Sequence, residues 1–349
     1  MRFFRSFIFL TIFCFPGLNI QAKAPVFRAD KPDNKPHRII RTCCSFGTDM
    51  QMFAIPGVKL TEITGLDKIG SHRYLGNMSE ENGIIYTRRG GFIDMGHLRD
   101  QIDWMAYIYI QLVKTKPNGR LSMILGHEGG EKTLKVQIPQ NLKDIDLILL
   151  SGKITYDLSV WHEIATWFGA STIPFVPERY SSFSIEDAFS NLMGVTIGIQ
   201  ALQSELPYEE AVTKLIAETL KDLDAVSNEA ETILAMNDVQ DVWWTHEKRL
   251  PSGKVLLQRQ VQVYPCLQPW LVPGWKSTTQ VPVELKVPEY TSSEELLTDF
   301  YKLEFKLNYK FPFHKMFPDR QDRTITQNDF DRLLVEVKTE LTRKDSKFR

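Results

Sequence analysis

Residues 161–169 carry the pattern that most constrains how this 349-residue chain folds. At helical spacing, an apolar stripe faces one side and is formed by Leu158, Trp161, Ala165 and Phe168. A smaller and more polar edge runs beside this stripe and carries His162, Thr166 and Gly169. A helix that only packs has no need of a His-Glu pair beside its buried face. We therefore take this edge as the first candidate for chemistry.

Two other segments repeat this arrangement. Residues 98–113 have an apolar face at spacings of three and four, made of Leu98, Ile102, Met105, Tyr109 and Leu112. The adjoining edge carries Asp94 and His97. Residues 184–203 present a small polar face, made of Asp187, Ser190, Asn191, Gly194 and Gly198. Because small residues let another element approach closely, we predict that these helices meet in a shared seam.

Shorter segments predict β-structure around these helices. Residues 121–125 and 133–138 fit two strands joined by a glycine-rich turn. Closing helices are predicted at 293–308 and 326–342, while 146–150 fits either a strand or the end of a helix. We therefore predict an α+β fold, with a predominantly helical core and small antiparallel β hairpins.

The composition of the ends divides the chain into four parts. Residues 1–24 are predicted to be a signal peptide, and 25–40, rich in proline and mixed charge, an extended lead-in. Residues 41–280 form the main α+β domain that carries the site. Residues 281–349 are predicted to be a C-terminal helical extension packed on that domain.

The N-terminal residues predict export. Arg2 and Arg5 precede an apolar run over 7–15, and Ala22-Lys23-Ala24 fits a cleavage site. The run is too short for an ordinary transmembrane helix. No later segment is apolar enough to anchor the chain, so we expect no transmembrane anchor after cleavage near Ala24. We expect a periplasmic or secreted protein.

Three cysteines remain after this cleavage, namely Cys43, Cys44 and Cys266. An odd number in an oxidising compartment leaves one thiol over, or a pairing between chains. Adjacent cysteines can join only through a strained ring. A possible disulfide therefore joins Cys43 or Cys44 to Cys266.

Several classes of function are disfavoured by the sequence. The formal net charge is −1, and cleavage after residue 24 removes three positive charges, so no basic domain suits nucleic acid. The turn at 126–130 lacks the Lys-Ser/Thr of a phosphate-binding loop. The Gly-x-Ser-x-Gly motif of common serine hydrolases is also absent.

The His162-Glu163 pair begins like the zinc-protease motif His-Glu-x-x-His, but Thr166 stands in place of the second histidine. A zinc site would therefore need ligands from separate elements. The best set is His97, His162 and Asp187, because imidazoles and a carboxylate are usual ligands of catalytic zinc. Glu163 would then be the base that activates bound water.

Other polar residues on the same helix edges complete this hypothesis. Asp94 would fix the tautomer of a histidine, as carboxylates do behind metal-binding imidazoles. Thr166 and Asn191 would orient the ligand or the groups around the metal.

Purely structural roles compete with each assignment. His97 could be a hydrogen-bonded core histidine, and Glu163 could pair with a cation on the surface. Asp187 could belong to a capping-box-like helix start. His127 and Glu128 lie in a glycine-rich turn and are interpreted as loop residues.

Five ordered stretches together resemble the exported bacterial family known as domain of unknown function 4056. They are residues 43–47, 90–100, 161–169, 183–194 and 269–274. The resemblance spans about 41–274 and implies a bacterial envelope setting, but no settled activity. Many members look like lipoproteins, a pattern that Cys14 fits poorly because bulky Phe13 precedes it.

Three functions follow from these residues. The leading hypothesis is an exported, zinc-dependent hydrolase that acts on an envelope or extracellular polymer or lipid. The first alternative is a metal-independent glycan-cleaving enzyme, with Glu163 as general acid and Asp187 as its carboxylate partner. The second is a non-catalytic envelope binding protein with aromatic stacking surfaces, which would use Trp243, Trp244, Tyr264, Trp270 and Trp275.

Overall fold

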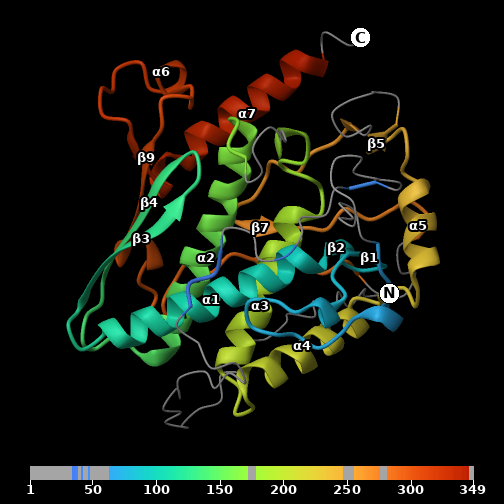
Figure 1. The fold of residues 1–349 in the computed structure, drawn as a ribbon, viewed down its shortest axis with the longest axis horizontal. Coiled ribbons are helices and arrows are strands. Elements are labelled where there is room, and N and C mark those ends of the chain that lie inside the picture. Colours follow the sequence, from blue (N-terminus) through green and yellow to red (C-terminus); the bar gives the residue numbers. More distant parts are fainter. Residues whose placement is uncertain are drawn as a thin grey trace, which may run out of the picture.

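The centre of the molecule is a group of three helices that pack on one another in the computed structural model (Figure 1). They are α1 (Met95–Thr115), α2 (Asp144–Trp167) and α3 (Asp187–Leu202). The structure describes residues 34–37, 41, 46–47, 63–171, 178–246, 255–275 and 281–345. Almost the whole circumference of α2 is buried, as expected for a helix that lies inside a core rather than on its surface.

Two glycines on α3 allow the close packing of α1 and α3. A Cβ atom on Gly194 would lie 2.2 Å from the Leu98 carbonyl oxygen of α1. A Cβ atom on Gly198 would lie 2.7 Å from Met105 Sδ. The predicted seam of small residues is therefore present, and it brings the first turns of α1 and α3 together.

One four-stranded antiparallel sheet covers the α2 side of this core, with strand order β10-β9-β4-β3. Its strands are β3 (Arg120–His127), β4 (Gly130–Gln137), β9 (Tyr301–Leu307) and β10 (Thr324–Thr326). Trp161 of α2 is fully buried and stacks on Phe305 of β9, with ring centroids 4.2 Å apart. The apolar stripe of α2 thus packs against the sheet, as the sequence predicted.

The remaining described elements surround the core. Three two-stranded antiparallel pairs are β1 (Ile84–Thr87) with β2 (Gly91–Asp94), β5 (Trp244–Thr245) with β6 (Val255–Leu256), and β7 (Cys266–Leu267) with β8 (Leu285–Lys286). The other helices are α4 (Tyr208–Asp222), α5 (Glu229–Asn237), α6 (Phe313–Met316) and α7 (Phe330–Asp345). The α+β class is confirmed. No helix in the described ranges is both long enough and apolar enough to cross a membrane.

The predicted helix at 293–308 is wrong. Residues 301–307 form β9, in which every second residue is buried and the residues between are exposed or half-buried, as in a strand with one face on the core. Because β9 pairs with β4, the segment 281–345 is built into the sheet and is more than a helical extension. The ambiguous stretch 146–150 lies within α2.

Several predictions fall outside the described residues. These include the signal peptide over 1–24, the adjacent residues Cys43 and Cys44, and most of the lead-in over 25–40. Cys266 lies in β7 and forms no disulfide with a described residue, and its pairing with Cys43 or Cys44 stays a prediction.

We expect Gly194→Ala to lower the free energy of unfolding by about 1–3 kcal/mol, because its methyl group meets the rigid backbone of α1. Gly152→Ala in α2 is the matched control. Its methyl group would lie 3.1 Å from the Val195 side chain, and that side chain can shift. The gain in helix propensity from glycine to alanine is similar at both positions. Urea unfolding curves of both variants test this. Equal effects at the two positions would contradict a backbone contact at Gly194.

Candidate functional site

The candidate site lies where the beginnings of α1 and α3 meet the C-terminal half of α2. Strand β2 runs directly into α1, and Asp94 is both its last residue and the N-cap of the helix. One Asp94 carboxylate oxygen accepts the His97 backbone N–H at 3.0 Å. The Asp94 backbone N–H in turn donates to Ser190 Oγ on α3 at 2.9 Å. These bonds fix the start of α1 against α3.

The two predicted histidines come together from different helices. The ring centroids of His97 on α1 and His162 on α2 are 6.4 Å apart. His97, His162 and Glu163 each offer one ligand atom, and these three atoms lie within 4.8 Å of one another. The side chains of His97 and His162 are 11% and 18% exposed. This trio is one of two groups in the described residues with metal-ligand spacing.

The second group is Asp94, His97 and Asp187, which shares His97 with the first. His97 Nδ1 lies 3.2 Å from Asp94 Oδ2 and 3.2 Å from Asp187 Oδ1. The predicted ligands His162 and Asp187 thus fall in different groups. Because His97 Nδ1 can carry only one proton, the two carboxylates share or compete for a single N–H.

Burial dominates the electrostatics of the acids on α3. Burial raises the pKa of Asp187 well above its ordinary value, against the attraction of His97 and with added repulsion from Glu186. Burial likewise raises the pKa of Glu186 to about 8, although the Ser184 hydroxyl donates to this side chain. The cap of α3 is Glu186, without a side-chain capping bond, so a capping-box role for Asp187 is not present.

Glu163 is not on the surface. Its residue is 3% exposed, and its Oε2 accepts the Phe183 backbone N–H at 2.5 Å. Neither lysine nor arginine forms an ion pair with Glu163, Glu186 or Asp187 in the described part of the chain. His97 is the basic group that lies beside Asp187, the positive charge of Arg259 acts on Glu163 through space, and surface pairing of Glu163 is excluded.

Thr166 and Asn191, the remaining predicted site residues, have different surroundings. Thr166 Oγ1 lies 2.7 Å from the His162 carbonyl oxygen and accepts from Ser182 Oγ at 3.1 Å, so it stabilises the end of α2. Asn191 is one turn after Asp187 and is 1% exposed. Its buried Oδ1 has no hydrogen-bond partner among the described residues, which leaves it available to a bound group.

Glu128 is a site residue that the sequence analysis interpreted as part of a loop. It follows β3 at the turn of the hairpin, and its Oε1 lies 2.7 Å from His162 Nδ1. Its Oε2 accepts from Lys132 Nζ at 2.7 Å, and its carbonyl oxygen accepts from Trp161 Nε1 at 3.1 Å. The only sequence signal is an acid in a turn four residues before a lysine, which does not reveal the contact with α2.

Two of the five aromatic residues proposed for a binding surface are interior, while Tyr264, Trp270 and Trp275 are partly exposed. Trp244 is 0% and Trp243 is 7% exposed. Trp243 packs edge-on against Phe92 and Trp270, with centroids 6.3 and 5.7 Å away. Trp243 and Trp244 therefore stabilise the core and do not offer stacking surfaces.

Glu128→Gln removes the charge that balances buried Lys132 while it keeps the side-chain shape. We expect the free energy of unfolding to fall by about 2–5 kcal/mol, because an uncompensated buried charge remains. Adding Lys132→Met to the same chain should restore much of this loss in chemical unfolding experiments. Lys135→Met is the control, since Lys135 is 50% exposed and its pair with Glu304 should contribute less than about 1 kcal/mol. A double variant as unstable as Glu128→Gln alone would contradict the pairing.

The comparisons with known proteins give one match. A family model described as "Protein of unknown function (DUF4056)" matches residues 31–273, a range that contains every residue of the candidate site. No curated protein and no solved structure gives a significant match. The matched range covers most of the chain. The chain therefore belongs to the DUF4056 family.

Proposed function

We propose that this protein is a metal-dependent hydrolase in which His97, His162 and Glu163 bind the metal. One observation carries the proposal: ligand atoms of two imidazoles and one carboxylate, from two helices, lie within 4.8 Å of one another. Two histidines and a glutamate are the protein ligands of several catalytic zinc sites, which keep a fourth position open. Zinc bound there would lower the pKa of a coordinated water and polarise a substrate carbonyl.

The carboxylates behind the histidines support this assignment. His97 Nδ1 faces Asp94 and Asp187, and His162 Nδ1 faces Glu128. A carboxylate beside Nδ1 holds the proton on that nitrogen and leaves the lone pair of Nε2 for a metal. We therefore assign Asp187, expected from the sequence as a metal ligand, to the orientation of His97, together with Asp94.

Glu163 also changes its role relative to the sequence hypothesis. Its Oε2 is held by the Phe183 N–H, so the other oxygen, Oε1, is the one available to a metal. We assign Glu163 as the third ligand rather than the base. A metal-bound water with a lowered pKa needs no strong base to ionise near neutral pH.

The proposed setting and substrate follow from the N-terminal pattern and the family resemblance. A charged start, a short apolar run and a small-x-small site are typical of exported proteins. In that compartment the accessible substrates are envelope or extracellular polymers and lipids. We propose that the hydrolase acts on a member of this class.

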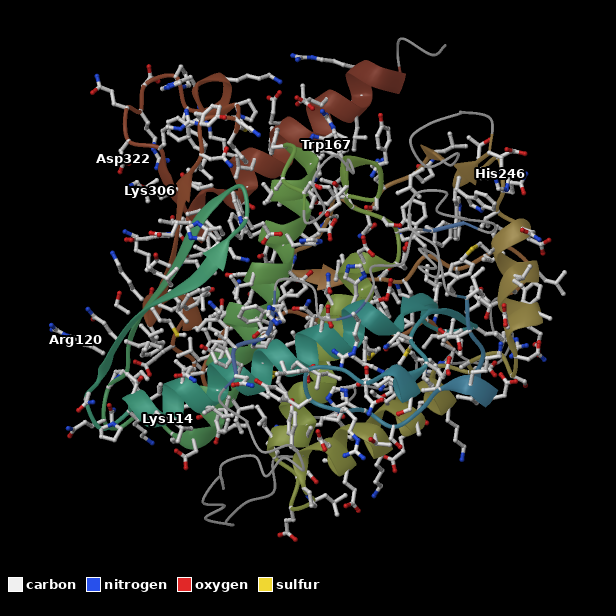
Figure 2. The ribbon with its side chains drawn as sticks, in the orientation of Figure 1. Lys114, Arg120, Trp167, His246, Lys306 and Asp322 are labelled. Carbon is white, nitrogen blue, oxygen red and sulfur yellow. The ribbon has the colours of Figure 1, made fainter. Side chains whose placement is uncertain are left out.

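Elemental analysis of the purified protein tests the metal site. We expect about one zinc per chain, and loss of most of it in His162→Ala and in Glu163→Gln. His246→Ala is the matched control, because His246 is exposed beside β5 and far from Trp167 at the end of α2 (Figure 2). Hydrolysis of ester, amide and glycosidic probes should stop with a chelator and return with zinc.

The variants also separate the competing roles. Full zinc in Glu163→Gln with loss of hydrolysis would return Glu163 to the role of base. Hydrolysis that resists chelation in a metal-free protein would overturn the proposal in favour of metal-independent glycan cleavage. Normal biological function in the Glu163→Gln, His162→Ala double variant would favour a binding protein.

Export is tested by expressing the full chain in a Gram-negative bacterium. We expect a periplasmic product that begins at Pro25, established by intact mass and N-terminal sequencing. Ala22→Arg places a large charged residue in the cleavage site and should leave the uncut precursor. A cytoplasmic product that keeps Met1 in the unmodified chain would contradict export.

A further inference from the structure

A left-handed backbone corner lies beside Glu163. Phe183 has φ = +56°, a region that L-residues other than glycine rarely adopt, and it is 1% exposed. For a bulky residue, this conformation is strained and persists only where the surroundings hold it. Its N–H is the group that donates to Glu163 Oε2 at 2.5 Å.

Two neighbouring residues from a distant part of the chain hold this corner. Arg259 donates from Nη1 to the Ser182 carbonyl oxygen and from Nη2 to the Tyr180 carbonyl oxygen at 3.0 Å. The backbone N–H of Gln260 donates to the Phe183 carbonyl oxygen at 2.9 Å. Residues 259–260 therefore fix the peptide groups on both sides of the Phe183 Cα atom, one of which contains the Phe183 N–H.

Arg259 is also fixed against the helix that carries Glu163. Its guanidinium carbon lies 5.4 Å from the ring centroid of Trp167, which follows Glu163 by one helical turn. Burial lowers the pKa of Arg259 to about 10, so the group stays cationic at neutral pH. A planar guanidinium can donate to two carbonyl groups at once, which the ammonium of lysine cannot do with the same geometry.

We infer that Arg259 and the left-handed corner at Phe183 are positioning elements that fix the orientation of the Glu163 carboxylate. Arg259 holds the carbonyl groups of Tyr180 and Ser182, and the corner directs the Phe183 N–H at Glu163 Oε2. The position of the other carboxylate oxygen, Oε1, is then fixed as well. This inference rests on the proposed role of Glu163 as a metal ligand. Its backbone part is independent of any metal.

The central variant is Arg259→Lys, with Arg179→Lys as its matched control. Arg179 also lies over Trp167, at 4.6 Å, but it pairs with Glu340 at 2.6 Å and not with the corner. Amide hydrogen exchange of Phe183 is measured by NMR in the metal-free proteins. We expect exchange to accelerate at least about tenfold in Arg259→Lys and to change less than about twofold in Arg179→Lys.

Zinc affinity is measured next, by competition with a chromogenic chelator. We expect Arg259→Lys to weaken zinc binding about 10–100-fold, as for other residues that orient metal ligands. Added to Glu163→Gln, the same change should have little further effect, because Arg259 acts through Glu163. Arg259→Met separates an effect of charge from an effect of positioning, because the two predict changes in zinc affinity of opposite sign. Loss of a nearby positive charge alone would tighten zinc binding, whereas loss of positioning weakens it.

The outcomes separate this inference from the proposed function. Unchanged Phe183 exchange in Arg259→Lys, or tighter zinc binding by Arg259→Met, would overturn the positioning role. Absence of zinc from the wild-type protein would overturn the proposed metal site. The amide hydrogen exchange of Phe183 would still decide whether Arg259 fixes the backbone there. Circular dichroism and the thermal midpoint confirm that each variant is folded. If Arg259→Met does not fold, Arg259→Lys decides.

Discussion

The structure depends on the burial of acidic groups between three helices. Asp94, Glu163, Glu186 and Asp187 are each at most 3% exposed, and a carboxylate loses much hydration energy in such a place. Elsewhere on α1 the same cost is offset by arginine: Arg41 lies 2.9 Å from both Asp100 and Asp103. In the site, the imidazole of His97 lies beside Asp94 and Asp187, and no arginine forms an ion pair with these acids among the described residues. The arginine cluster also holds an imidazole, His72, 3.1 Å from Asp103, so it is the lack of a pairing arginine that makes the second cluster a candidate for chemistry.

The acids can come this close only because the helices themselves do. Gly194 removes the side chain that would keep α3 away from Leu98, and Asp94 joins the two helices through Ser190. The ligand positions are thus set mainly by backbone contacts, and side chains from the β3–β4 turn and from residues 180–183 refine them. A site on rigid helices keeps its geometry better than one built on loops alone.

Much of this could be predicted from sequence, because helical periodicity shows which residues share an edge. The edges of three helices correctly brought His97 near both His162 and Asp187. Periodicity did not reveal Glu128, since its contact with His162 depends on how a hairpin packs on α2. Periodicity alone would not place Glu163 beside His162, because the two side chains diverge by about 100° on an ideal helix. The sequence analysis included Glu163 as a base, and both residues can reach the site because α2 is enclosed nearly all round. β9 was missed although its apolar residues alternate at every second position, because Leu296, Leu297 and Phe300 just before it have the spacing of a helix face that the prediction extended to residue 308.

The pairing of β4 with β9 has a consequence for the order in which the protein matures. Leu134 of β4 lies opposite Leu303 of β9, and the family match ends at residue 273, before that strand begins. During synthesis, both histidines leave the ribosome long before Phe305, on which Trp161 stacks. Contacts between such distant segments form late, because a long loop must close first. The hairpin that holds Glu128 against His162 therefore gains its full support only after residues 301–307 have left the ribosome.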